Sequence, residues 1–144
     1  ATSGDITVDG ATNVDVQADS GSVTVRDVRG TVKTQASSGD VTLNDVGGDV
    51  SVMANSGTVT GTGLAGQADV TANSGDVTLA MASVTDVKVV ADSGTISVAV
   101  PRARYRIEGT ADGGTRSVSV PTDLSSPHVL DLTADSGDVT VTAR

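Results

Sequence analysis

The chain has 144 residues, a formal net charge of −9 and one aromatic residue, Tyr105. Its 25 Val and 20 Thr favour β-strands over helices, and the acidic, ring-poor composition excludes a nucleic-acid-binding surface. Without cysteine no disulfide can form, and no apolar run reaches the ~20 residues that a membrane-spanning helix needs.

A Ser-Gly pair punctuates the chain at intervals of 17 to 23 residues. Such self-similarity at a nearly fixed period is typical of repeat architectures. One position of the series is filled by Gly113-Gly114. The Ser-Gly pairs begin at Ser3, Ser20, Ser38, Ser56, Ser74, Ser93 and Ser136.

Each interval reads as two short strands joined by a turn. In residues 38–55, apolar and polar residues alternate on both sides of a Gly47-Gly48 turn, which predicts two half-buried strands. The same inward columns recur in the other intervals. Two residues after the glycine stand Ile6, Val23, Val41, Val59, Val77, Ile96 and Val139, and seven after it stand Ala11, Val28, Val46, Leu64 and Ala82.

A two-strand repeat cannot bury its own apolar face, but stacked copies can. The sequence therefore predicts an all-β β-solenoid (β-helix) of about seven coils, with two or more short strands per coil and a rise of ~4.8 Å per coil. A β-sandwich or meander with hairpin turns is the alternative. We expect one domain over residues 1–144, with regular coils over 3–92 and looser, wider coils over 93–144 in which Tyr105 fills the added space.

The outward Thr/Ser column and the residue Arg116 lead to two further expectations. Three residues after each glycine, the outward position is always Thr or Ser, which predicts a polar ladder on one wall. In the seventh coil Arg116 falls on an inward position, so either its side chain swings out or the register slips by one residue there. The ladder residues are Thr7, Thr24, Thr42, Thr60, Thr78, Ser97, Ser117 and Thr140.

The one basic cluster is formed by Arg102, Arg104 and Arg106, which alternate with Tyr105 and two aliphatic residues. Alternation places the three guanidinium groups on one face, where they could contact an anionic polymer, a lipid headgroup or a protein partner. The alternative is that they form salt bridges with acids of adjacent coils, such as Asp131.

Neither a metal site nor catalysis is predicted. Aspartates flank the turns, but the calcium-binding repeat Gly-Gly-x-Gly-x-Asp is absent, and Ca²⁺ needs six to eight converging oxygens. The single histidine, His128, lies in a loop at residues 125–128, and no strained Gly-x-Ser-x-Gly turn supplies a nucleophile. We expect no cofactor and no enzyme activity.

The segments Ser-Gly-Asp-Val-Thr-Leu at 38–43 and 74–79, Ser-Gly-Asp-Val-Thr-Val at 136–141, and the tail from Ser93 to Arg144 resemble a known pattern. They are similar to the adhesin-like bacterial domain family of unknown function with repeated SGDVT strands, which is related to the head domains of auto-transporter adhesins. This resemblance implies a right-handed β-solenoid, exported or tethered at the cell envelope, and it carries no catalytic residues.

We therefore expect a non-enzymatic, extracytoplasmic β-solenoid that serves as a scaffold or interaction module at the bacterial cell envelope, with any signal or anchor outside this segment. A carbohydrate- or envelope-polymer-binding adhesive domain is the first alternative, and a polysaccharide-processing enzyme is the second. The chain's last strand, near residues 139–142, is expected to form an open edge. That edge predicts a homodimer, unless residues 122–128 fold over it.

Overall fold

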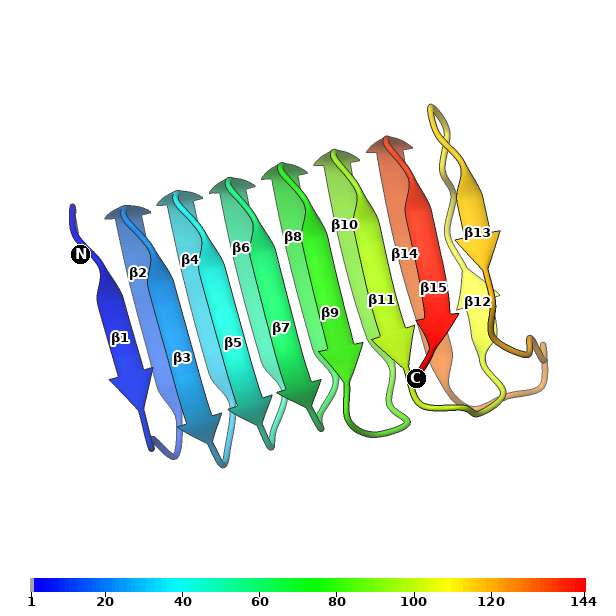
Figure 1. Ribbon diagram of the computed structural model, residues 1–144, viewed down its shortest axis with the longest axis horizontal. Coiled ribbons are helices and arrows are strands. Elements are labelled where there is room, and N and C mark those ends of the chain that lie inside the picture. Colours follow the sequence, from blue (N-terminus) through cyan, green and yellow to red (C-terminus); the bar gives the residue numbers. More distant parts are fainter. Residues whose placement is uncertain (1) are drawn as a thin grey trace.

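The computed structural model of the protein describes residues 2–144, and every regular element within that range is a β-strand. The strands form two parallel sheets (Figure 1). In spatial order, the eight-stranded sheet contains β1 (Ile6–Asp9), β3 (Val23–Val28), β5 (Val41–Val46), β7 (Val59–Leu64), β9 (Val77–Met81), β11 (Ile96–Val100), β15 (Val139–Ala143) and β13 (Arg116–Val118). The seven-stranded sheet contains β12 (Arg106–Glu108), β14 (Val129–Ser136), β10 (Val87–Ser93), β8 (Ala68–Ser74), β6 (Val50–Ser56), β4 (Val32–Ser38) and β2 (Val14–Ser20).

The path of the chain is a right-handed β-solenoid. In Figure 1 the front strands run downward, the fainter rear strands run upward, and the chain advances from left to right from β1 to β11. Neighbouring strands such as β3 and β5, or β4 and β6, pair in parallel. A hairpin would pair its strands antiparallel, so the predicted solenoid is confirmed and the alternative of hairpin turns is wrong.

The prediction of about seven coils assumed that all coils stack in chain order. In the structure they do not. Five regular turns, from β1–β2 to β9–β10, follow one another along the rod. After β11 the chain skips one position, forms β12 and β13 at the end of the rod, and then returns to insert β14 and β15 into the position that it had skipped (Figure 1).

The predicted open edge at the last strand is therefore wrong. β15 is paired with β11 on one side and with β13 on the other. The edge strands at this end of the rod are β12 and β13 instead. The start of β12 is covered by the loop that follows β13, residues 119–128. There the backbone N–H of Tyr105 donates to Pro121 O at 3.2 Å, and that of Asp123 donates to Tyr105 O at 2.8 Å.

The sequence columns coincide with the strand register. The inward column that contains Val41 is paired along the whole front sheet and is fully buried from Val23 to Val139. The outward Thr/Ser column is paired in the same register, so the predicted polar ladder is confirmed. Its spatial order is Thr7, Thr24, Thr42, Thr60, Thr78, Ser97, Thr140 and Ser117.

One predicted inward residue is wrong. Leu64 pairs with Met81, which is buried, whereas Ala82 is exposed. The register shifts between Thr62 and Leu64, where the bulged Gly63 adds one residue to β7 that β9 lacks. Period counting across the fifth coil therefore selected the residue one position too late.

Of the two alternatives for Arg116, the slip in register is wrong and the outward side chain is observed. Arg116 keeps the register of the inward column, pairing with Val139, and yet it is exposed because β13 is the last strand of its sheet. Its guanidinium donates to the backbone carbonyl of Gly109 at 3.0 Å. A charged side chain thus closes the end of the aliphatic core.

Tyr105 is fully buried in the C-terminal part of the rod, as expected. Its phenol donates to Pro101 O at 2.9 Å, which satisfies the buried hydroxyl. Burial raises the pKa of this phenol above its ordinary value.

The inward and outward side chains of β5 lead to a prediction that compares two substitutions. Val41→Asp buries an uncompensated carboxylate at a position with 0% exposure, so it should cost about 3–5 kcal/mol. Thr42→Asp, on the half-buried outer ladder, should cost under about 1 kcal/mol. Urea unfolding of the two variants measures the difference, and equal losses would contradict the assigned facing.

Thr34 is a polar residue in the core of the second turn. It is fully buried between Val16 and Val52, and its hydroxyl has no hydrogen-bond partner within residues 2–144. Thr34→Val should therefore stabilise the fold by about 1 kcal/mol, because it removes an unsatisfied buried group. The same replacement at Thr42 is the control in thermal melts, and a gain of equal size there would contradict this explanation.

Candidate functional site

Aspartates at the Ser-Gly corner connect one turn of the rod to the next. In alternate turns an aspartate follows the glycine, and its Oδ1 accepts a hydrogen bond from the backbone N–H of the equivalent residue in the neighbouring turn. The acceptor and donor pairs are Asp5 and Ser22 at 2.9 Å, Asp40 and Thr58 at 2.9 Å, Asp76 and Thr95 at 2.9 Å, and Asp138 and Thr115 at 2.8 Å.

The opposite corner, before each rear strand, repeats this device. Asn13 Oδ1 accepts from the N–H of Thr31 at 3.1 Å, and Asp49 Oδ1 accepts from that of Gln67 at 3.1 Å. In the fifth turn Asp86 Oδ1 accepts from the N–H of Val129 at 3.0 Å. These side chains therefore hold successive turns together, and no group of three or more His, Asp or Glu side chains in residues 2–144 is arranged to hold a metal ion.

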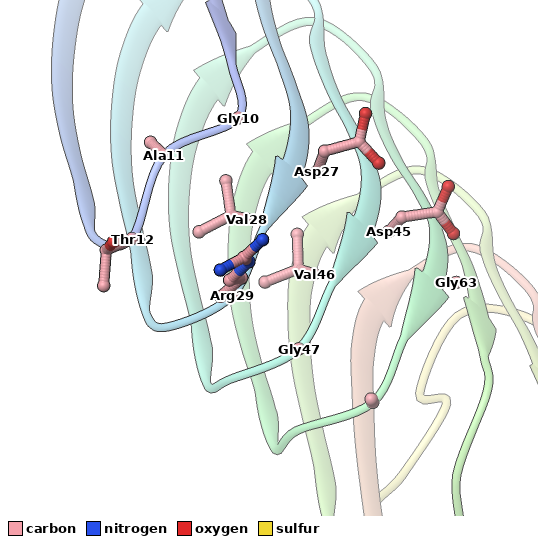
Figure 2. A pocket seen from close by; sticks show the side chains of 11 residues that line it. Gly10, Ala11, Thr12, Asp27, Val28, Arg29, Asp45, Val46, Gly47 and Gly63 are labelled. Atoms are coloured by element: carbon pink, nitrogen blue, oxygen red, sulfur yellow. The ribbon is translucent and has the colours of Figure 1, made fainter.

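A groove of about 770 Å³ runs along the corner that follows β1, β3, β5 and β7 (Figure 2). It crosses several turns, so its axis follows the rod and not the strands. Asp27 and Asp45 lie on neighbouring turns, and their carboxylates point the same way, while Val28 and Val46 lie on the other side. The lining residues are Gly10, Ala11, Thr12, Asp27, Val28, Arg29, Asp45, Val46, Gly47, Gly63 and Ala65.

Backbone conformation explains the residue types at this corner. Asp27 and Asp45 have φ of 51° and 53°, and Gly10 and Gly63 complete the column at 69° and 66°. Aspartate and glycine are among the few residues that tolerate this left-handed region. A Cβ at Gly63 would lie 2.3 Å from Asp45 Oδ1, so the exposed Asp45 side chain would have to move to admit it.

The corner groove was missed at the level of sequence, although a signal exists. The position six residues after the turn glycine is Gly or Asp in the first four repeats, which marks a left-handed corner. The groove offers exposed carboxylates from Asp27 and Asp45 and the exposed guanidinium of Arg29, while Val28 and Val46 beneath them are buried in the core. These charged groups suit hydrogen bonding and ion pairing with an extended molecule laid along the rod.

The arginine cluster is partly neutralised. Arg104 lies 3.5 Å from Asp123, and Arg106 Nε lies 2.8 Å from Glu108 Oε1, so the acids involved do not include Asp131. Arg102 is exposed and has no hydrogen bond or ion pair with the described chain. Tyr105 is buried between the exposed Arg104 and the half-buried Arg106, as the alternation predicted.

Asp123 anchors the loop that carries these contacts. Hydrogen bonds from the Ser125 hydroxyl and backbone N–H, with a further contribution from the Arg104 guanidinium, hold the pKa of its carboxyl below the usual value. The carboxylate therefore stays ionised and keeps Arg104 and the loop together.

The loop around His128 contains Ser126, and Asp86 lies nearby, but the three side chains do not form a nucleophile and base pair. The Ser126 hydroxyl donates to Arg104 O at 2.8 Å and accepts from the backbone N–H of His128 at 3.2 Å. The His128 ring contacts Asp86, with Nδ1 and Oδ1 3.8 Å apart. The serine hydroxyl is thus engaged with the backbone and not with the imidazole.

Comparison with known proteins gives one match. Residues 1–142 match the family model described as Toastrack DUF4097. No curated protein and no solved structure matches the chain. Within the described residues, the structure has no helix long and apolar enough to cross a membrane.

The corner hydrogen bonds generate a prediction at Asp40. Asp40→Ala removes the acceptor for the N–H of Thr58 and should cost about 1 kcal/mol in urea unfolding. Asp40→Asn should retain most of the stability, because an amide oxygen fills this role at Asn13. Asp19→Ala, at an exposed position of β2, is the control and should change stability by under about 0.5 kcal/mol. An Asn variant as weak as the Ala variant would contradict the acceptor role.

Proposed function

The chain belongs to the Toastrack DUF4097 family, and we propose that it is a non-enzymatic scaffold and interaction module, exported to the bacterial cell envelope. The observation that carries this proposal is the use of its polar side chains. Aspartates such as Asp40 and Asp76 accept backbone hydrogen bonds between turns, and Ser126 is engaged with the backbone. Groups that an enzyme would direct at a substrate are used here to hold the rod together.

The shape of the molecule supports a scaffold. Two parallel sheets around a continuous aliphatic core form a rod, and the outer wall of the eight-stranded sheet repeats the same Thr/Ser ladder at every turn. Such a rod holds the surfaces at its two ends and along its corners at fixed distances from one another, as a scaffold requires. A solenoid of this kind presents an extended surface to partners, as repeat proteins commonly do.

An adhesin-like role, the binding of a carbohydrate or another envelope polymer, is the second candidate, and the corner groove favours it. The groove has a volume of about 770 Å³ and crosses several turns, so it suits an extended chain better than a compact metabolite. The unpaired Arg102 adds a cationic group for an anionic polymer, but it lies far along the chain from the groove.

The envelope location can be tested with the full-length gene product in its native bacterium. The chain described here has no cysteine, so Ser51→Cys introduces a thiol at an exposed position of β6. We expect a membrane-impermeant maleimide to label this variant in cells whose outer layers admit the reagent but whose cytoplasmic membrane is intact. The unsubstituted product gives the background, and labelling only after complete lysis would contradict an extracytoplasmic location.

The purified chain can then separate binding from turnover. Incubated with isolated envelope polysaccharide, it should co-sediment without releasing new reducing ends. Release of reducing ends that grows with time would favour the enzyme instead. Co-sedimentation lost in Asp45→Asn and Arg29→Ala, but kept in Asp19→Ala, would assign the polymer contact to the corner groove.

A further inference from the structure

The end of the rod contains a position that is filled out of chain order. β12 is paired only with β14, and β13 only with β15. We call this position the C-terminal slot: it lies between β10 and β11 on one side and β12 and β13 on the other, and residues 129–143 fill it. Of the strands in the two sheets, β12 and β13 therefore pair only with strands of this segment.

The two sides of the slot are poorly suited to close on each other. If β13 moved onto β11 in the register that both strands share with β15, Thr115 would lie beside Thr95. The backbone N–H of Thr115 now donates to Asp138 Oδ1 at 2.8 Å, and Thr95 offers no carboxylate to replace that acceptor.

The slot accepts a narrow class of segment. At the turn, a Cβ on Gly137 would lie 1.9 Å from Gly94 O, and one on Gly114 would lie 2.0 Å from Gly137 O, so glycine is required. On the rear strand Leu130 and Leu132 fill the core with 0% exposure. A Ser-Gly-Asp turn between two alternating strands meets these requirements, and residues 129–143 of another copy supply it.

The segment is attached to the rest of the rod by a loop that can act as a hinge. Residues 119–128 connect β13 to β14, and six of these ten residues are exposed. The loop is anchored by Asp123, which lies 3.5 Å from Arg104, and by Ser126, which donates to Arg104 O at 2.8 Å. Fully extended, ten residues span about 33 Å, enough to reach an adjoining copy.

We propose that the C-terminal slot is a strand-exchange site, and that its partner is the segment 129–143 of a second copy of the chain. In the exchanged dimer each slot holds the other copy's β14 and β15, and every strand pairing of the single chain is kept. Exchange of an identical element has a low energetic cost, and it is favoured by high concentration. The proposal does not depend on where the protein resides or what polymer it binds.

The test uses two single-cysteine variants of the 144-residue chain, Ser97→Cys and Thr140→Cys, which are paired across β11 and β15 on the outer ladder. Both are unfolded in urea, mixed in equal amounts, refolded at millimolar concentration and oxidised. We expect disulfide-linked dimers joined between positions 97 and 140, at least fivefold above the control. The control mixture, Thr42→Cys with Thr60→Cys, is paired in the same way within the sequential turns.

A double variant carrying both Ser97→Cys and Thr140→Cys, oxidised as a monomer, keeps the segment in its own slot. Light scattering after further incubation at millimolar concentration should find it monomeric while the unsubstituted chain forms dimers. Equal dimer fractions for the locked and unlocked chains would overturn the proposal. So would disulfide-linked dimers no more abundant than those of the control mixture.

Discussion

The close stacking of glycines at the Ser-Gly corner is the constraint on which the rest of the structure depends. From Gly21 onward, each of these glycines lies against the carbonyl oxygen of the glycine in the adjacent turn, and a Cβ there would come within 2.2 Å of that oxygen. Seven of them also have positive φ, from 107° at Gly21 to 142° at Gly137. Because the corner admits no side chain, the turns approach at the spacing of paired strands, ~4.8 Å, and both ladders follow.

Such close stacking brings like charges near each other, and the chain avoids this by alternation in the column that directly follows the corner glycines. Two carboxylates ~4.8 Å apart would repel by about 1 kcal/mol even in bulk water. At the Ser-Gly corner Asp therefore alternates with Ser or Thr in spatial order, and each carboxylate is used as an acceptor for a neighbouring N–H. The structural repeat is thus two turns, although the apolar pattern repeats at every turn.

Much of the fold could be predicted because its causes are local and periodic. The glycine spacing and the inward columns predict where the strands lie, which side chains face the core and where the Thr/Ser ladder runs. These predictions hold wherever successive turns stack in chain order. The period fails at Met81, because a single bulged residue, Gly63, changes the count between two turns. The corner groove was missed because its signal is backbone conformation at Asp27 and Asp45, which hydrophobic patterning does not report. The arginine contacts depend on a loop whose path has no period.

The spatial order of the last strands was also missed, although the sequence contains a trace of it. In chain order Thr95 is followed by Thr115 and then by Asp138, which breaks the alternation of acids. Inserting Asp138 between the two threonines restores it, and this is the order observed in the sheet. Polar columns therefore carry information on stacking order that the uniform apolar columns lack.

The returning path at the end of the rod has a consequence for how the molecule is made. A chain synthesised or exported from its N-terminus can add the turns up to β11 one at a time, each on a finished neighbour. Residues 101–118 then emerge before the strands on which they must rest. The last layer can form only after residues 129–143 have followed, so completion of the rod is delayed until nearly the whole chain has left the ribosome or the export channel.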